Sequence, residues 1–414
     1  MSVRRATTVV AALSALILGS ASVALADPGD VDTGFGTSGR ATVDLTGTDR
    51  VAGMDRQSTG RIVVAGDGSG NAMQVFRLLP GGAPDTGFGT GGSSTLASSA
   101  SSSFTATDMA IQGNDRIVVT GWEEAVSGRD QFVVGRFRAG GAPDSDFGTG
   151  GIKRVGFSQA DAFSYGVAVQ PNGRIVVVGE VDPVSTSISK IALIRLLPGG
   201  GLDTSFGNGG RRLVKLPDSV AGFDGAWRVR IMGDGRIVLA GWNEVAGDFY
   251  RTVVVRLRPS AAFDTTFSGD GIAVFDARPG FDDWAYALEL AGGKIVLGLA
   301  GVSGEATVAR LTSSGVRDTA FSGNGVATFL VSGFYASDVA VWPDGKIVVG
   351  ENSSGTGKIL RIRPGGGRDS AFGVNGVTSD PAGPDAIEAI ELQGGKILVA
   401  GDAAGVSYVS RFLG

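Results

Sequence analysis

The residues best suited to chemistry are acids and tryptophans that follow apolar runs in the middle of the chain. Trp122-Glu-Glu, Glu180 and Trp242-Asn-Glu each come directly after a run that begins Ile-Val. Aromatic rings beside carboxylates can hold a sugar ring or a cationic group. The alternative is that the acids form a solvated rim and each Trp covers its own sheet. The candidate ligand-binding residues are Trp122, Glu123, Glu180, Trp242 and Glu244.

Other kinds of site are disfavoured by residue types that are missing or out of context. The chain has no His and no Cys, which removes the commonest general base, the usual zinc ligand and every Ser-His or Cys-His pair. Gly34-Phe-Gly-Thr-Ser-Gly matches a dinucleotide fingerprint, but no helical pattern follows it. Asp264 and Asp270 lack the further acids of a calcium loop. We therefore expect no catalytic residue, no bound metal and no cofactor.

The first 26 residues have the organisation of a secretory signal peptide. Arg4 and Arg5 supply positive charge, residues 7–18 are mostly apolar, and Ala24-Leu-Ala provides a cleavage site near Ala26. Loss of these two arginines from the 36 Lys and Arg leaves 34 against 41 Asp and Glu, a net charge of −7 that argues against nucleic-acid binding. We expect a secreted protein, extracellular or periplasmic, that is monomeric and has no stable membrane anchor.

Two short phrases recur along the rest of the chain and must build the elements that position these residues. One, which we call the box, has the pattern Asp-Thr/Ser-x-Phe-Gly/Ser. The other, which we call the second phrase, is a Lys or Arg that begins an apolar run, as in Arg174-Ile-Val-Val. A fixed period of roughly 50–60 residues indicates a stack or ring of similar small sheets. The boxes begin at Asp32, Asp85, Asp144, Asp203, Asp264, Asp318 and Asp369.

The third unit shows what one repeat contains. Residues 165–170, 174–179, 191–197 and 211–216 are β runs, separated by turns such as Pro171-Asn-Gly. The second run is apolar on successive residues, which predicts burial on both faces. Four antiparallel strands whose central members are buried on both faces are typical of a β-propeller blade.

The two ends of the repeat array predict a closed ring. The chain begins with a lone box and a strand at residues 40–45, and it ends after a third strand at residues 407–413. Pairing these two strands would complete a seventh blade and cover two open sheet edges. The sequence therefore predicts an all-β fold, a single seven-bladed β-propeller over residues 27–414, with four antiparallel strands per blade.

Two recurring residues have predicted structural roles. The box Phe, such as Phe206, is expected to be buried between blades. An Arg in the third strand precedes the next box Asp by eight residues in every unit, as Arg195 precedes Asp203. This constant interval predicts either a repeated ion pair on the structural face or two independent turn residues.

Loop lengths divide the ring into two faces. The interval from the second phrase to the third-strand Arg is longest in units two to four, at 20, 21 and 20 residues. These loops and the blade-to-blade connections emerge on one face of an antiparallel blade, and function commonly lies on such variable loops. Aromatic residues on the connections are Phe104, Phe163, Phe223, Phe281, Trp284, Phe334 and Tyr335.

The repeats resemble the delta-60 repeat family, whose units carry L-D-T-S-F-G-x-x-G and D-G-K-I-V-V-x-G. Leu202-Asp-Thr-Ser-Phe-Gly-Asn-Gly-Gly and Asp344-Gly-Lys-Ile-Val-Val-Gly match these patterns nearly letter for letter. The resemblance covers essentially the whole chain after the signal peptide. It implies a bacterial exported β-propeller of unassigned activity and adds no catalytic residue.

Three functions remain open at this point. The favoured one is a secreted, non-catalytic binding or scaffold module for an extracellular glycan, peptide or surface protein. A metal-assisted hydrolase of the lactonase type could use channel acids such as Asp108, Asp338 and Glu388, although Arg228 and Arg230 share that layer. A purely structural envelope protein without a ligand is the third.

Overall fold

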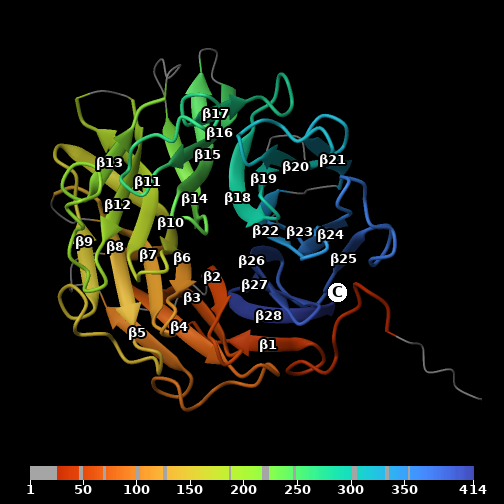
Figure 1. The fold of residues 1–414 in the computed structure, drawn as a ribbon. Helices are drawn as coiled ribbons and strands as arrows, with labels where there is room; N and C mark the ends of the chain where they lie inside the picture. The colour runs from red at the N-terminus through yellow and green to blue at the C-terminus, as the bar shows by residue number, and fades with distance from the viewer. Residues whose placement is uncertain are drawn as a thin grey trace, which may run out of the picture.

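The structure is a computed structural model that describes residues 26–45, 50–68, 71–97, 103–124, 128–185, 188–216, 223–245, 249–300, 305–331, 335–352 and 355–414. These residues form seven four-stranded antiparallel sheets and contain no helix. The sheets stand around a central channel as the blades of a propeller (Figure 1). The predicted all-β, seven-bladed architecture is thus confirmed.

Each blade has an innermost, a second, a third and an outer strand. The innermost strands contact one another around the whole ring. They are β2 (Val51–Arg56), β6 (Ser103–Ile111), β10 (Ala160–Val169), β14 (Asp224–Ile231), β18 (Trp284–Ala291), β22 (Ala336–Val341) and β26 (Ala386–Gln393). The second strands are β3 (Ile62–Gly68), β7 (Ile117–Glu124), β11 (Ile175–Pro183), β15 (Ile237–Val245), β19 (Lys294–Ala300), β23 (Ile347–Glu351) and β27 (Lys396–Ala403).

The outer half of each blade completes the sheet. The third strands are β4 (Ala72–Leu78), β8 (Gln131–Phe137), β12 (Lys190–Leu196), β16 (Phe249–Leu257), β20 (Glu305–Thr312), β24 (Lys358–Ile362) and β28 (Val406–Leu413). The outer strands are β5 (Ser93–Ala97), β9 (Ile152–Val155), β13 (Arg211–Val214), β17 (Ile272–Phe275), β21 (Val326–Leu330), β25 (Val377–Ser379) and β1 (Arg40–Val43).

The ring closes as the sequence predicts. Strand β1 is antiparallel to β28, with Arg40 opposite Ser410 and Val43 opposite Ser407. In Figure 1 the red N-terminal strand lies along the blue C-terminal blade. The strand ends two residues before the predicted Leu45, whose side chain is nevertheless fully buried. The seventh blade therefore contains both ends of the described chain.

The core lies between neighbouring blades, because second strands are apolar on both faces. All seven box phenylalanines are fully buried, as predicted, and each contributes roughly 1.5–3 kcal/mol to folding. A Cβ added to Gly141 or Gly200 would lie 3.0 Å from the ring of Phe88 or Phe147, respectively. These glycines belong to the next blade, so each box Phe is packed across a blade boundary.

The repeated ion pair is also present in every blade. The third-strand Arg lies 2.7–2.9 Å from its box Asp in all seven pairs, including Arg411 with Asp32 across the closure. The same guanidinium stands 4.4–4.8 Å from the centre of the box Phe ring. We call these seven Arg–Asp–Phe sets the girdle.

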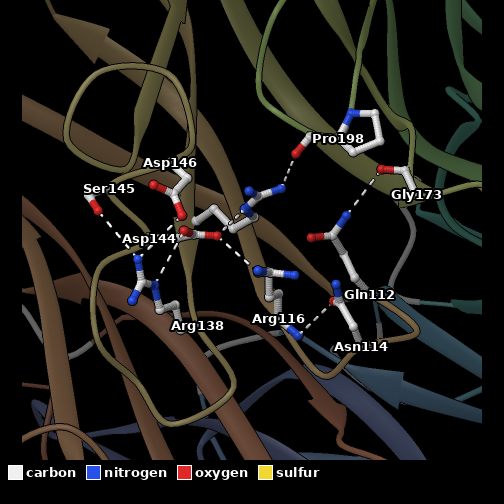
Figure 2. A network of polar contacts seen from close by, with 10 residues as sticks. Gln112, Asn114, Arg116, Arg138, Asp144, Ser145, Asp146, Gly173 and Pro198 are labelled. Carbon is white, nitrogen blue, oxygen red and sulfur yellow. Dashed lines mark hydrogen bonds and ion pairs between the residues drawn. The ribbon is translucent and has the colours of Figure 1, made fainter.

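A second cation joins the girdle that sequence reasoning did not assign to it. The Lys or Arg that opens the second phrase also contacts the box Asp in six blades, as Arg116 contacts Asp144 at 3.0 Å (Figure 2). The exception is Lys346, which pairs with Asp344 instead. Burial alone would raise the pKa of Asp203, but Ser205, Arg174 and Arg195 lower it to about 2.

The girdle arginines also connect neighbouring blades. Arg77 donates to the carbonyl of Ala139 at 2.7 Å, and Arg310 donates to that of Pro364 at 2.6 Å. These carbonyls belong to turns after the third strands, on the face we call the turn face. The opposite face, which carries the second-to-third loops and the blade connections, is called the loop face.

Candidate functional site

Every innermost strand is interrupted by a β-bulge at the same place. In β10, for example, the pairing with β11 jumps from Ser164 to Gly166 and leaves Tyr165 as the extra residue. This bulge explains why β10 begins at Ala160, five residues before the predicted start, since pairing resumes beyond it. The seven bulge residues are Ala52, Thr107, Tyr165, Trp227, Tyr286, Ser337 and Glu388.

These seven residues, which we call the bulge ring, all line a single cavity of about 420 Å³. The cavity lies in the channel toward the loop face, because its lining includes Arg50 and Tyr335, which directly precede β2 and β22 on that face. A bulge re-aims a side chain out of the regular strand alternation, and such features are frequent beside binding sites. The scaffold thus presents one side chain per blade to the same space, which we call the cup.

One side of the cup is aromatic. Trp227 stacks on Tyr286 with ring centres 4.8 Å apart and planes 22° apart, and it lies 4.2 Å from Tyr165. Trp284 meets Tyr286 edge to face at 6.4 Å, and Tyr335 completes the lining. This half of the cup therefore offers flat apolar surfaces from blades three to six.

The other side of the cup is polar. Thr107, Ser337, Asn352 and Glu388 line it, and Arg50 stands exposed at its rim. Asn352 donates a 2.7 Å hydrogen bond to Glu388. Burial raises the pKa of Glu388 to about 7. The polar side can therefore both donate and accept hydrogen bonds near neutral pH.

Two of the predicted site residues support the cup from behind. Trp242 is buried and packs on Trp227 with ring centres 5.1 Å apart. Glu180, which is 8 % exposed, accepts a 2.6 Å hydrogen bond from the hydroxyl of Tyr165. Burial raises the pKa of Glu180 to about 7. Glu180 and Trp242 thus fix the orientation of two bulge-ring aromatics without lining the cavity.

The other three predicted site residues have different surroundings. Trp122 packs edge to face on Phe163, with ring centres 5.2 Å apart. Glu123 is buried and forms an ion pair with Arg154 at 2.6 Å. Glu244 accepts a 2.7 Å hydrogen bond from the backbone amide of Phe223. The structure therefore brings Glu180 and Trp242 together around Tyr165, whereas Trp122, Glu123 and Glu244 each have separate partners. Parts of the three long loops, and Phe334, lie outside the described residues.

The channel aspartates have a structural use. Asp108 accepts hydrogen bonds from the backbone amides of Met109 and Val167, each at 2.9 Å. Asp338 does the same with Val339 and Ile390 of the next blade, at 2.9 and 2.8 Å. Such carboxylates satisfy amides at the edges of neighbouring innermost strands. Within the described ranges no group of three or more His, Cys, Asp or Glu side chains is placed to hold a metal ion.

A second cavity of about 450 Å³ occupies the channel toward the turn face. Its charged lining includes Arg230, which forms a 3.2 Å ion pair with Glu289. Glu391 lies 3.8 Å from Arg56, and burial raises the pKa of Glu391 to about 8. The lining of this cavity contains six carboxyl groups and two arginines, so acidic residues predominate in it. Arg228 belongs to the lining of both cavities.

The bulge ring escaped the sequence analysis, although a signal for it exists. The bulge residue precedes the Lys or Arg of the second phrase by nine residues in five blades and by eight in blades five and seven. The shorter interval occurs where the hairpin is Gly-Gly, as before Lys294 and Lys396. The bulge residue thus lies at a nearly constant distance before the second phrase, although its type changes from blade to blade. Such a pattern indicates a repeated backbone position with a variable side chain.

Comparisons with known proteins agree with the fold. Residues 57–88, 170–206 and 233–267 match a family described as a domain of unknown function (DUF5122) beta-propeller. A comparison with curated proteins found no match. No helix among the described residues is long and apolar enough to cross a membrane. The chain is therefore a repeat protein whose repeats are similar to those of a β-propeller family.

Solved structures share the architecture at low sequence identity. One is a catalytically inactive His-to-Ala variant of virginiamycin B lyase from Staphylococcus aureus with quinupristin, at 14% identity and a TM-score of 0.52, covering 90% of this chain and 98% of that one. Another is the selenomethionine-substituted lyase from the same organism, at 14% identity and a TM-score of 0.51, covering 90% of this chain and 99% of that one. At this identity the likeness shows the propeller fold alone.

Proposed function

We propose that this protein is a secreted, non-catalytic binding module that holds a saccharide in the cup. The observation that carries the proposal is the convergence of all seven bulge residues on one cavity, with three stacked or tilted aromatic rings on one side. Aromatic faces pack against the apolar face of a sugar ring, while Asn352, Ser337 and Glu388 can bond its hydroxyls.

The placement of the carboxylates favours binding over hydrolysis. Asp108 and Asp338, which a lactonase-type enzyme would need for a metal, both bind backbone amides through their two oxygens. The inactive lyase variant lacks a histidine side chain, and this chain has no His at all. We therefore do not extend the lyase activity to this protein.

The setting of the proposed module comes from the sequence. The predicted signal peptide lies in residues 1–26, of which residues 1–25 are outside the described part of the chain. The resemblance to the delta-60 repeat family supports an exported bacterial propeller. We propose that the protein acts as a monomer outside the cytoplasm, with the loop face turned to its ligand.

The test is a glycan-array screen of the purified propeller with matched Trp variants. Trp227→Ala removes the central ring of the cup and is expected to weaken any hit by about 30-fold or more. Trp342→Ala is the matched control, because Trp342 lies in a hairpin of the turn face, away from the cup lining. Trp122→Ala tests the long loops separately, since its ring packs on Phe163.

Three outcomes are informative. Loss of binding in Trp227→Ala alone supports the cup. Loss in Trp122→Ala with retention in Trp227→Ala would move the site to the long loops predicted from the sequence. Absence of any hit across glycans, with the protein folded, would overturn the saccharide proposal in favour of a peptide ligand or a structural role.

A further inference from the structure

We infer that the saccharide bound in the cup carries a carboxylate, and that Arg228 is the residue that binds it. This inference rests on the proposed function and names the class of ligand: an acidic sugar such as a hexuronic or sialic acid. It is carried by a half-buried guanidinium that faces the cavity and has no ion-pair partner among the described residues.

Arg228 follows the bulge residue Trp227 directly in β14. Its side chain lines both channel cavities, so it lies at the floor of the cup. Its guanidinium makes a long hydrogen bond, 3.4 Å, to the carbonyl of its own neighbour Trp227. A guanidinium has five N–H donors, and this contact occupies at most one of them.

Arg230, two residues later in the same strand, provides an internal comparison. It also lines the channel, but it forms a 3.2 Å ion pair with Glu289 of the adjacent blade. Its charge is therefore balanced within the protein. No ion pair of the described residues includes Arg228, although both arginines stand in the same channel.

The charge of Arg228 opposes the rise in the pKa of Asp108 and of Glu388, but no ion pair of the described residues joins either carboxyl group to Arg228. Both oxygens of Asp108 accept hydrogen bonds from backbone amides, those of Met109 and Val167. Glu388 accepts a hydrogen bond from Asn352, and burial raises its pKa to about 7, so much of it is uncharged at neutral pH. Arg50 adds a second cation at the rim of the cup. The lining of the cup therefore contains two arginines and a single carboxyl group, that of Glu388.

The neighbours of Arg228 fit a sugar acid better than a simple anion. Tyr286 and Trp227 form a stacked aromatic surface beside it, with ring centres 4.8 Å apart. A pyranose ring packed on these rings would bring a carboxylate on its edge to the guanidinium at the floor. Arginine binds carboxylates in a fixed two-donor geometry, which provides specificity as well as affinity.

The experiment compares acidic saccharides with neutral partners of the same size, at one ionic strength. The probes are oligogalacturonate against its methyl ester, and sialylated glycans against the same glycans after sialic acid removal. Wild type is expected to prefer at least one acidic member by about tenfold or more. Arg228→Gln should abolish that preference, so that the acidic and neutral partners bind with equal affinity.

Arg258→Gln is the matched control, because it removes the same charge from an exposed position on the turn face. It should retain the acidic preference, which excludes a general charge effect. Equal binding of acidic and neutral partners by wild type would overturn this inference and leave the proposed function intact. Absence of binding to either class would overturn both. Retention of the acidic preference in Arg228→Gln would also reject Arg228 as the carboxylate-binding residue.

Discussion

The girdle and the bulge ring come from the same seven repeats but differ in what they repeat. Every blade gives the girdle the same Arg, Asp and Phe at the same distances. Every blade gives the bulge ring the same backbone irregularity but not the same side chain. The seven residues are Ala52, Thr107, Tyr165, Trp227, Tyr286, Ser337 and Glu388.

Under the proposed function, this difference separates the architectural positions of a repeat from the positions that recognise the ligand. Every blade boundary needs the same contacts between neighbouring blades, so the same girdle residues recur in all seven blades. A ligand has no sevenfold symmetry, so a ring that recognises it must offer different groups at equivalent places. The bulge supplies a constant direction for the side chain, and the residue at that position supplies the chemistry.

The largest loss of stability is expected when the closure of the ring is removed. Deleting residues 27–45 removes β1, the buried Phe35 and Asp32, the girdle partner of Arg411. The edge of β28 becomes unpaired, so we expect aggregation or a fall in melting temperature of about 10 °C or more. Circular dichroism melting and size-exclusion chromatography measure the effect. The control is the chain that starts at residue 27, and equal melting of the two would refute closure by β1.

The next largest effect is expected from a single girdle carboxylate. Asp203→Ala leaves Arg195, whose side chain is 7 % exposed, without its carboxylate partner. Removing one member of a buried pair costs about 3 kcal/mol, which urea unfolding should detect, while saccharide binding should stay unchanged. The turn-face control is Asp234→Ala, an exposed carboxylate 3.5 Å from Arg236, with an expected cost of roughly 0.5 kcal/mol or less.

A double-mutant cycle measures the coupling energy between Asp203 and Arg195. Combining Asp203→Ala with Arg195→Leu should recover part of the lost stability, because the buried guanidinium is removed and only Arg174, which is 34 % exposed, loses its partner. Purely additive effects would show that the two side chains contribute independently, although they lie 2.8 Å apart.

The sequence predicts the girdle well because its residues repeat in type and in spacing. The eight-residue interval between Arg195 and Asp203 follows from a fixed turn, so a linear pattern reports a spatial contact. The second cation of the girdle was missed for the converse reason. Arg174 and Asp203 are separated by a loop of variable length, and no constant interval marks their 2.8 Å contact.

The cup could not be predicted by the same reasoning, because a bulge is a property of backbone pairing and not of residue type. Trp227 and Glu388 hold equivalent bulge positions, but one side chain is aromatic and the other is a carboxylic acid. The sequence instead predicts a site on the long loops, because their lengths vary between blades. The bulge ring varies in side chain at a nearly constant distance from the second phrase, so no recurring residue type marks it. Trp242 and Glu180, found through the loops, prove to contact the ring from behind.

The smallest predicted effect is the pH dependence of the folding stability that Glu180, the hydrogen-bond partner of Tyr165, introduces. Burial raises the pKa of Glu180 to about 7, above the 4.5 of an unperturbed Glu, so the folded state binds a proton more tightly than the unfolded state. Its contribution to stability is complete below about pH 4.5 and is lost as pH rises through 7. Glu388 and Glu391, with pKa values of about 7 and 8, act in the same direction.

Glu180→Gln isolates the contribution of Glu180, because Gln still accepts the hydrogen bond from Tyr165 and does not titrate. We expect the variant to exceed wild type in unfolding free energy by roughly 1–2 kcal/mol at pH 8 and to match it near pH 4.5. Urea unfolding across this range measures the difference, with Glu124→Gln, an exposed change in β7, as the control. A constant difference at all pH values would show that Glu180 is not titrating, and that orienting Tyr165 carries no cost in stability at neutral pH.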